Sequence, residues 1–438
     1  MKPKYFLALG LLVLGLGSCG ESFFEQYPSN NITEGNFYKT DDDFNQGVVA
    51  CYAKLKTQMS FHLTEIGYRG DENVLESMAV STQNRYDIDH FAETANNGIL
   101  NDIWNAWYNG IYRCNDVLDH MTGAKIANYD KYRGECLFLR SWWYFNLYRV
   151  FGVVPITRTV VTPAAAKLIP RCTEEEMYTL LTEDLAEAAR LLPPTPGPEK
   201  ARVANIAAYT LLAKVYLTFG KPAEAKTALE EAMKNTSYGL ESTTKKVFDV
   251  GNKMNREIIF ALYYNKTNDN GHGYWYSANT DVLADINNPT PTFKAIYDSE
   301  KDNRLPLISS YTKIKDNLFA MTKWYDTYDA TYTTQVGNDF PHLRYADVVL
   351  MYAEALAESG GSLGDALEWL NKTRTRAGLD ELTTDEVKSL AEFRRELAAE
   401  RGREFALEGH RWFDLVRLGL AVDYFREMGY SLDSHNLI

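Results

Sequence analysis

The chain has 438 residues, of which 45% are apolar and 13% aromatic, so it can bury a large core and is not a disordered polypeptide. Its formal net charge of -13 argues against nucleic acid or an anionic membrane surface as a partner, because phosphate binding needs clustered lysine and arginine. Its 29 tyrosines and 8 tryptophans suit a core as well as the faces of sugars or peptides, so composition leaves both uses open.

The N-terminal segment is typical of a secreted bacterial lipoprotein. Two lysines precede an apolar run over residues 5–16, and small residues then lead to Cys19. The run is shorter than the roughly 20 residues that span a bilayer, and residues 16–19 resemble a lipobox. We therefore expect residues 1–18 to be a signal peptide, Cys19 to carry the lipid, and residues 19–30 to form a polar tether. An ordinary signal peptide that happens to contain a cysteine is the alternative.

The next elements are predicted to be helical. The acidic stretch at residues 40–44 predicts a helix start, because the carboxylates of Asp41 to Asp43 would face the positive end of the helix. A calcium site in this stretch is the alternative. A long helical pattern follows at residues 131–152 and is expected to end at Gly152.

Two further segments have the pattern of a tetratricopeptide hairpin, two helices joined by a short turn. In residues 204–235, Gly220 ends one apolar helical pattern and Pro222 opens the next. Residues 346–379 repeat this layout around Gly360. Because the two hairpins are widely separated in the sequence, we predict a mostly α fold in which tetratricopeptide-like hairpins form a scaffold for long irregular insertions, with few short strands.

The insertions are rich in Asn, Asp, Gly, Thr and Tyr and poor in periodicity, and long loops on a rigid framework often carry binding sites. They cover residues 60–100, 156–173, 236–300 and 301–341. The stretch at 257–264 is a strand candidate, and the proline-rich run at 191–200 is expected to be a stiff turn between two helices.

The sequence contains no pattern of a metal or cofactor site. The four remaining cysteines, Cys51, Cys114, Cys136 and Cys172, have no C-x-x-C spacing, so we expect no disulfide framework. We expect Cys114 and Cys136 to be buried as small apolar side chains. The seven histidines are scattered, and neither a nucleophile elbow nor a P-loop is present. We therefore expect no bound metal and no cofactor.

The most charged segment spans residues 396–419, where glutamates recur every four residues beside arginines. Paired carboxylates could act as acid and base on a glycosidic bond. The favoured interpretation is an ion-paired helix, because three pairs of oppositely charged residues stand at i, i+3 spacing. These pairs are Glu400 with Arg403, Glu408 with Arg411 and Asp414 with Arg417.

Several segments, in this order, resemble the SusD/RagB nutrient-binding lipoproteins of Bacteroidota. They are NDIWNAWYNGIYRCNDVLDHM at 101–121, KYRGECLFLRSWWYFNLYRVFGVVPI at 131–156, HLRYADVVLMYAEALAESG at 342–360, ALEWLNKTRTRAGL at 366–379 and ELAAERGREFALEGHRWFDLVRLG at 396–419. The resemblance implies a SusD-like N-terminal portion at 31–235 and a C-terminal portion at 236–438 within one globule. Family members continue into a longer C-terminal tail, which is expected to be missing here.

The resemblance also implies a function. Such proteins are lipid-anchored in the outer membrane, face outward, and rest on a SusC-like TonB-dependent transporter barrel. They capture a glycan, or a peptide in the RagB branch, deliver it to the transporter, and are not enzymes. Two alternatives stay open: a surface glycoside hydrolase, and a tetratricopeptide adaptor that binds protein helices. The identity of the ligand is not readable from the sequence.

Aromatic residues in polar loops are the ligand-site candidates, because a sugar ring needs a flat ring beneath it and polar groups at its edge. The leading candidate is Trp275, flanked by Tyr274 and Tyr276. Other loops add polar and aromatic side chains: Arg69, Asp71, Asn84, Arg85, Tyr86, Trp324 and Tyr325. The other tryptophans lie in helical patterns and are expected to pack in the core.

Overall fold

Helices dominate the computed structural model, which describes residues 37–72, 83–265, 272–273, 277–279, 289–315, 318–326 and 335–430. The signal segment, Cys19 and the tether lie outside these residues and stay predictions. Among the described helices, none is long and apolar enough to cross a membrane.

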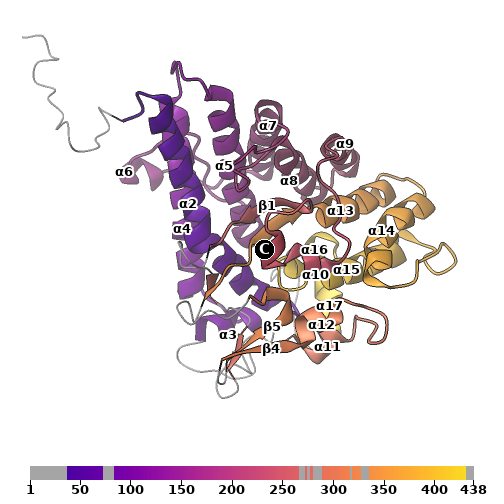
Figure 1. The fold of residues 1–438 in the computed structure, drawn as a ribbon. Coiled ribbons are helices and arrows are strands. Elements are labelled where there is room, and N and C mark those ends of the chain that lie inside the picture. The colour runs from indigo at the N-terminus through magenta and orange to yellow at the C-terminus, as the bar shows by residue number, and fades with distance from the viewer. Residues whose placement is uncertain are drawn as a thin grey trace, which may run out of the picture.

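Four long helices form the N-terminal part, and Figure 1 shows α2 and α4 running side by side. They are α2 (Asp41–Ile66), α4 (Gly98–His120), α5 (Tyr129–Phe151) and α7 (Glu174–Leu191). The acidic residues begin α2 as predicted, and the Asp43 carboxylate accepts the backbone N–H of Thr40 at 2.7 Å. The helix predicted at 131–152 is also confirmed, and it ends at Gly152, whose φ is 68°.

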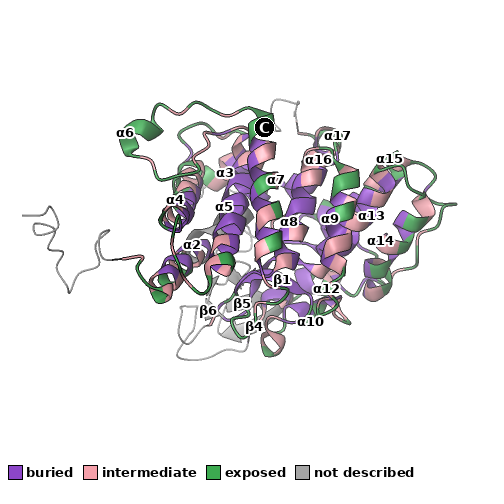
Figure 2. Ribbon diagram, turned by 90° about the horizontal axis from the view of Figure 1, so that it is seen from above, coloured by how far each residue is buried: buried purple, intermediate pink, exposed green. Residues whose placement is uncertain are grey.

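Both predicted hairpins are confirmed. They are α8 (Asn205–Thr218) with α9 (Pro222–Met233), and α13 (Tyr345–Glu358) with α14 (Leu363–Ala377). Gly220 and Gly360 have φ values of 67° and 82°, which glycine adopts without steric cost. Because α9 packs against α13, the helices α7, α8, α9, α13 and α14 form one continuous row, visible in Figure 2. The hairpins are thus neighbours in space although a long insertion separates them in sequence.

A central antiparallel pair of strands lies against this row. The predicted strand is confirmed as β1 (Ile258–Leu262), and it pairs with β7 (Phe340–Arg344). All five residues of each strand are buried. Smaller sheets join β2 (His272–Gly273) to β6 (Gln335–Val336), and β3 (Ser277–Asn279) to β5 (Leu318–Met321) and β4 (Tyr311–Lys315).

The insertions are less irregular than predicted. Residues 60–66 continue α2, so the predicted start of the first insertion is wrong. Short helices occur in all four insertions or at their edges: α3 (Gln83–Asp89), α6 (Pro163–Ala166), α10 (Thr244–Val247), α11 (Pro291–Lys294) and α12 (Leu305–Ser309). In the part of the insertions that the structure describes, 3-10 turns add Gly67–Arg69, Val250–Asn252 and Thr322–Trp324. The proline-rich run connects α7 to α8, as expected.

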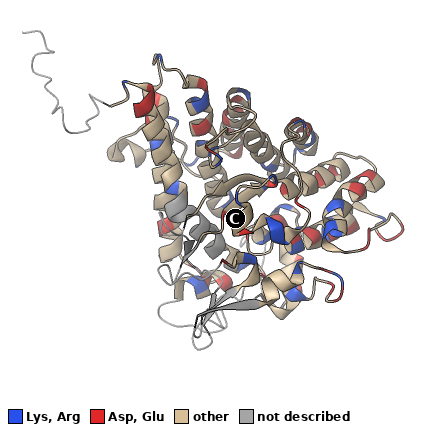
Figure 3. Ribbon diagram, in the orientation of Figure 1, with Lys and Arg blue, Asp and Glu red and all other residues tan. Residues whose placement is uncertain are grey.

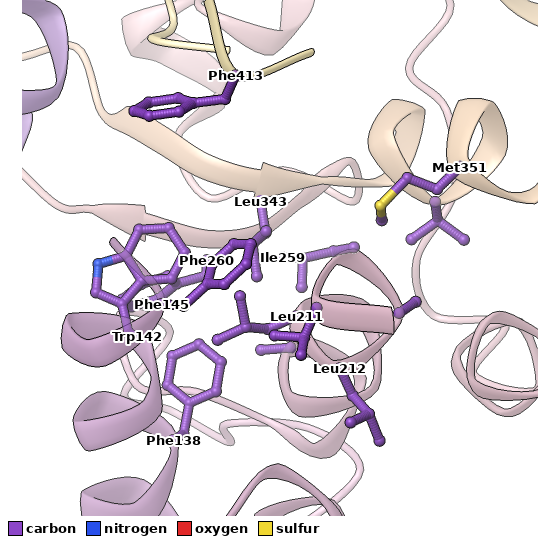
Figure 4. Close-up of a cluster of buried hydrophobic side chains, with 14 of the residues drawn as sticks. Phe138, Trp142, Phe145, Leu211, Leu212, Ile259, Phe260, Leu343, Met351 and Phe413 are labelled. Carbon is purple, nitrogen blue, oxygen red and sulfur yellow. The ribbon is translucent and has the colours of Figure 1, made fainter. Parts of the chain in front are cut away.

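Large aromatic side chains fill the core between these layers. Phe138 and Trp142 of α5 meet Phe260 of β1 edge to face, with ring centroids 5.1 and 5.4 Å apart (Figure 4). Trp107 and Trp143 are also buried, as predicted. The cysteines of α2, α4 and α5 are buried and free, and the described residues contain no group of side chains suited to a metal ion.

The charged C-terminal segment is two helices rather than one. α15 (Leu390–Glu404) and α16 (Arg411–Arg417) are separated by a turn in which Leu407 has a φ of 62°, and α17 (Ala421–Glu427) follows. The pairs Glu400–Arg403 and Asp414–Arg417 are confirmed, at 3.0 and 2.8 Å. The pair of Glu408 with Arg411 is wrong, because the turn separates them: Glu408 bonds to Lys323 and Arg344, and Arg411 bonds to Asp71.

Candidate functional site

The strongest sequence candidates, Tyr274, Trp275 and Tyr276, lie outside the described residues and stay predictions. The other seven candidates are described. They come from three places in the fold: the turn after α2, helix α3, and the turn after β5.

Asp71 and Arg69 lie in the turn after α2, and both are buried. The Asp71 carboxylate accepts two hydrogen bonds from the Arg411 guanidinium, at 2.8 and 3.2 Å, and one from the Tyr424 hydroxyl. Arg69 pairs with Glu93. The Asp71 contacts fasten the turn to α16 and α17, and the Arg69 contact fastens it to the segment after α3.

Trp324 and Tyr325 follow β5, and the structure places Trp324 in the core. Only 3% of Trp324 is exposed, and its ring stacks on Phe340 with a centroid distance of 5.4 Å. Tyr325 is half-buried and borders a separate small hollow with Phe248 and Leu307. In Figure 2, β5 lies apart from α3, so the structure does not gather all described candidates into one patch.

Asn84, Arg85 and Tyr86 lie together on α3, which is held firmly to the scaffold. The Asn97 side chain donates to the Asn84 carbonyl at 2.9 Å. Its oxygen also caps α4 by accepting hydrogen bonds from the backbone N–H groups of Ile99 and Leu100. At the other end of α3, Phe91 packs against Trp412 and Phe425, with both centroid distances 5.5 Å. These contacts at both ends of α3 fix the position of the helix and therefore of the side chains that it carries.

The Tyr86 ring stacks on a residue that the sequence analysis missed, His90. The centroids are 3.8 Å apart and the planes 18° from parallel. Tyr86 is half-buried and His90 is exposed, so the pair presents aromatic surface to solvent beside the exposed amide of Asn84. The i, i+4 spacing of the two rings on a helix is the signal that could have found His90. We call residues 84–90 the α3 platform.

A second open aromatic surface was also missed. A groove of about 550 Å³ is lined by Val49, Tyr52 and Tyr263 and bordered by Arg202 and Lys253. Tyr263 is 41% exposed, and the Lys253 ammonium lies 4.2 Å from its ring centroid. This groove offers the same combination of flat rings and polar rim as the α3 platform, in a different part of the fold.

The carboxylates of the charged segment are not arranged for acid-base chemistry. Glu400, Glu404 and Glu408 are buried, and each pairs with at least one arginine within 3.0 Å. Burial by itself raises the pKa of Glu404, but Arg376, Arg344 and Arg304 hold that pKa well below its usual range. A general acid needs a raised pKa and access to substrate, and this carboxylate has neither. The ion-paired interpretation of the segment is therefore confirmed for two of its three pairs, and its carboxylates also pair with other elements. Figure 3 marks the basic and acidic residues along the ribbon.

Comparison with known proteins adds two matches to family models. The model described as "Starch-binding associating with outer membrane" matches residues 27–217, and the model described as "SusD family" matches residues 303–437. The SusD-like protein P2 of Formosa agariphila is 26% identical over 97% of this chain and 93% of its own length. Over a shorter stretch, 23% of this chain and 17% of its own length, the starch-binding protein SusD of Bacteroides thetaiotaomicron is 36% identical.

Solved structures share the fold. A SusD superfamily protein of Bacteroides vulgatus superposes with a TM-score of 0.78 at 23% identity, over 92% of both chains. A laminarin-binding SusD-like protein superposes with a TM-score of 0.75 at 24% identity, over 92% of this chain and 96% of its own. The two matched segments, and relatives that align along almost the whole chain, show that this chain belongs to the SusD/RagB family.

Proposed function

We propose that the protein binds a glycan at the cell surface and delivers it to a SusC-like TonB-dependent transporter, without catalysis. Lipid on Cys19 would hold it in the outer membrane with its binding surface facing outward. The observation that carries the proposal is the Tyr86–His90 stack on the α3 platform. The names of several relatives, among them a laminarin-binding SusD-like protein and surface glycan-binding proteins, favour a glycan over the peptide alternative.

The chemistry of the α3 platform suits a sugar. A pyranose ring has an apolar face of C–H groups, which packs on an aromatic ring, and hydroxyls at its edge, which need hydrogen-bonding partners. Tyr86 and His90 supply the rings, and Asn84 and Arg85 supply an amide and a guanidinium within the same short helix. Asp71 bonds to Arg411 of α16, and the Arg69 guanidinium lies over Trp412 of the same helix, against which Phe91, next to the platform, packs.

We also propose that Trp275, with Tyr274 and Tyr276 beside it in the sequence, contributes to glycan binding. These rings lie in a polar segment without helical period, where nothing in the sequence pattern requires them to be buried. Trp324 and Tyr325 would contribute indirectly, because the contact of Trp324 with Phe340 fixes the turn after β5.

Titration of the purified protein with a panel of neutral polysaccharides, their oligosaccharides and peptides tests the proposal. We expect a glycan to bind, and Trp275→Ala and Tyr86→Ala each to weaken it at least tenfold, which corresponds to about 1.4 kcal/mol. Tyr112→Ala is the matched control, because Tyr112 is 48% exposed on α4 and lies about 21 Å along that helix from Gly98. Unchanged binding in both variants, or loss only in Tyr263→Ala, would contradict the site.

Anchoring and delivery need separate experiments. Labelled fatty acid should be incorporated into the wild-type protein and not into Cys19→Ala, and the wild-type protein should be accessible to protease added outside intact cells. Affinity purification from the native membrane should recover a TonB-dependent transporter. Steady product release from the bound glycan at catalytic protein concentrations would instead favour a glycoside hydrolase.

A further inference from the structure

A partly open hollow lies where the C-terminal end of α5 meets α8 and α16. Its volume is about 490 Å³, which is within the range of pockets that bind small molecules. Phe145, Tyr148 and Phe413 supply apolar lining, and Arg149, Lys214 and Arg417 supply positive charge. None of the residues that line this hollow belongs to the α3 platform.

Arg149 is the one of these cations that the described part of the chain does not neutralise. Each of the others has a carboxylate partner: Lys214 pairs with Asp347, Arg417 with Asp414 and Glu354, and the neighbouring Arg401 with Asp347 and Asp414. Arg149 forms no ion pair with any described residue. It donates one hydrogen bond, to the side chain of Asn146, and its Nε is buried without an acceptor.

Two phenyl rings hold the Arg149 guanidinium. Its central carbon lies 4.0 Å from the ring centroid of Phe413 and 4.7 Å from that of Phe145, residues that α16 and α5 contribute and that Figure 4 labels. Such rings attract a cation but offer no lone pair to its N–H groups. The N–H groups that Asn146 does not use are therefore available to an acceptor in the plane of the guanidinium, which is the geometry in which arginine binds a carboxylate.

The nearby carboxylates also do not offset the cost of burying the positive charge of Arg149. Burial lowers the pKa of Arg149 to about 9, despite the more distant carboxylates of Asp414 and Asp347. An anion at the free N–H groups would stabilise the charged form, and the low polarity around the two rings would strengthen the contact.

We infer that this hollow binds the carboxylate of a small ligand through Arg149, with an apolar face of the ligand against Phe145 and Phe413. The other lining groups limit the ligand to one negative charge. Both oxygens of Asp414 are taken by arginines, and Glu174, at the exposed rim, accepts the Tyr148 hydroxyl at 2.9 Å. Asp414 therefore has no oxygen left for a further partner, and the negative charge of Glu174 would repel a polyanion. An acidic sugar and a non-sugar carboxylic acid share the required chemistry.

Calorimetric titration of the purified protein with glucuronate, benzoate and glucose tests the inference. We expect glucuronate, benzoate or both to bind, and glucose, which matches glucuronate but lacks its carboxylate, to bind at least tenfold more weakly. Binding of glucuronate alone identifies an acidic sugar as the ligand class, and binding of benzoate alone identifies a non-sugar acid. No binding of either carboxylate at millimolar concentration, or equal binding of glucose, would overturn the inference.

Variants locate the binding in this hollow. Arg149→Gln should weaken carboxylate binding at least tenfold and Arg149→Lys less, whereas Arg158→Gln, an exposed arginine paired with Glu183, should leave it unchanged. Val153→Trp keeps Arg149 but fills the hollow, so it should abolish binding at an unchanged melting temperature even if Arg149→Gln folds poorly. Wild-type affinity in Val153→Trp would place the ligand elsewhere. Tyr86→Ala should have no effect, which separates this site from the α3 platform.

Discussion

Two regions of the core are equally buried but are stabilised by different interactions. Around α4 and α5, buried aromatic and aliphatic side chains dominate, and buried charges occur as separate arginine–carboxylate pairs, Arg140 with Asp184 and Arg202 with Glu135. Around α15 and β7, five cations and five carboxylates of the described residues form one connected network. Its cations are Arg304, Lys323, Arg344, Arg376 and Arg403, and its carboxylates are Glu257, Asp302, Glu400, Glu404 and Glu408.

The difference shows what each kind of core can do. The free energy gained by apolar packing is roughly proportional to the apolar area removed from water. Such packing joins neighbouring helices without fixing particular partners. A buried network is stable only when every charge is matched. Its members come from the residue before β1, the segment before α12, the 3-10 turn after β5, β7, α14, α15 and the turn after α15. The network therefore fixes the relative positions of segments that are far apart in sequence. It thereby fixes the segments that lead to the proposed binding loops.

The largest expected effect is at the centre of the network. Arg344→Leu would leave the carboxylates of Glu257, Glu404 and Glu408 without a shared cation, so we expect a loss of about 3–5 kcal/mol in the free energy of unfolding. Urea denaturation measures it. Arg190→Leu is the control, because Arg190 is an exposed arginine paired with Glu187, and it should leave stability close to that of the wild type. Equal effects in the two variants would contradict the distinction between the regions.

A pH-dependent effect is expected at Glu72, beside the network. Burial raises the pKa of Glu72 to about 8, and Asp71 adds to the rise, while the Leu407 N–H donates to its carboxylate at 3.1 Å. The folded state therefore binds a proton more tightly than the unfolded state, and stability is lost as the pH rises from about 4.5 to about 8. The loss is on the order of 4 kcal/mol.

Glu72→Gln keeps an acceptor for Leu407 but removes the titration. We expect the variant to match the wild type near pH 5 and to exceed its stability progressively up to pH 8.5, as measured by urea unfolding at several pH values. A difference between variant and wild type that is constant over this range would show that Glu72 titrates normally.

A smaller effect is expected in the aromatic region, at Gly110 of α4. A Cβ atom there would lie 2.3 Å from the indole ring of Trp143. Gly110→Ala should therefore destabilise the protein by about 1–3 kcal/mol, although alanine is the better helix former. Gly67→Ala is the control, because no atom lies within 4 Å of the added Cβ. If Gly110→Ala melts at a higher temperature than the wild type, the close contact of α4 with α5 is not as tight as described.

The smallest effect is expected at a helix start that belongs to neither region. The Thr173 hydroxyl accepts the N–H of Glu176 at 3.1 Å, and the Glu176 carboxylate accepts the N–H of Thr173 at 2.7 Å. Thr173→Ala should cost about 1 kcal/mol. Thr227→Ala, on the exposed part of α9, should cost less than about 0.5 kcal/mol in the same thermal melts.

The contrast between the regions also explains which predictions succeeded. Apolar residues at helical spacing, with glycine at the ends, predicted α5, the α8–α9 hairpin and the α13–α14 hairpin. The same approach failed in the charged segment, because i, i+3 spacing suggests partners only within an unbroken helix. The turn at Leu407 breaks that helix, and Arg411 binds Asp71, 340 residues earlier in the chain.

The candidate site was predictable only in part. Asn84, Arg85 and Tyr86 were identified as polar and aromatic residues of one loop, and they lie on one short helix. The loop composition gave no indication that Trp324 would be buried against Phe340, because burial of that ring depends on a strand that arrives from elsewhere in the chain. His90 was missed because α3 was not expected to be helical.

The sequence by itself determined the family, the long helices, the two hairpins and the charge balance, because each depends on local spacing or on motifs that the chain carries in order. Only the tertiary structure decided that the hairpins form one row, that the charged segment is an internal network, and that Arg149 stands without a carboxylate partner among the described residues. The physical reason is that ion pairing and burial depend on distances in space. Those distances join residues hundreds of positions apart, and no local pattern encodes them.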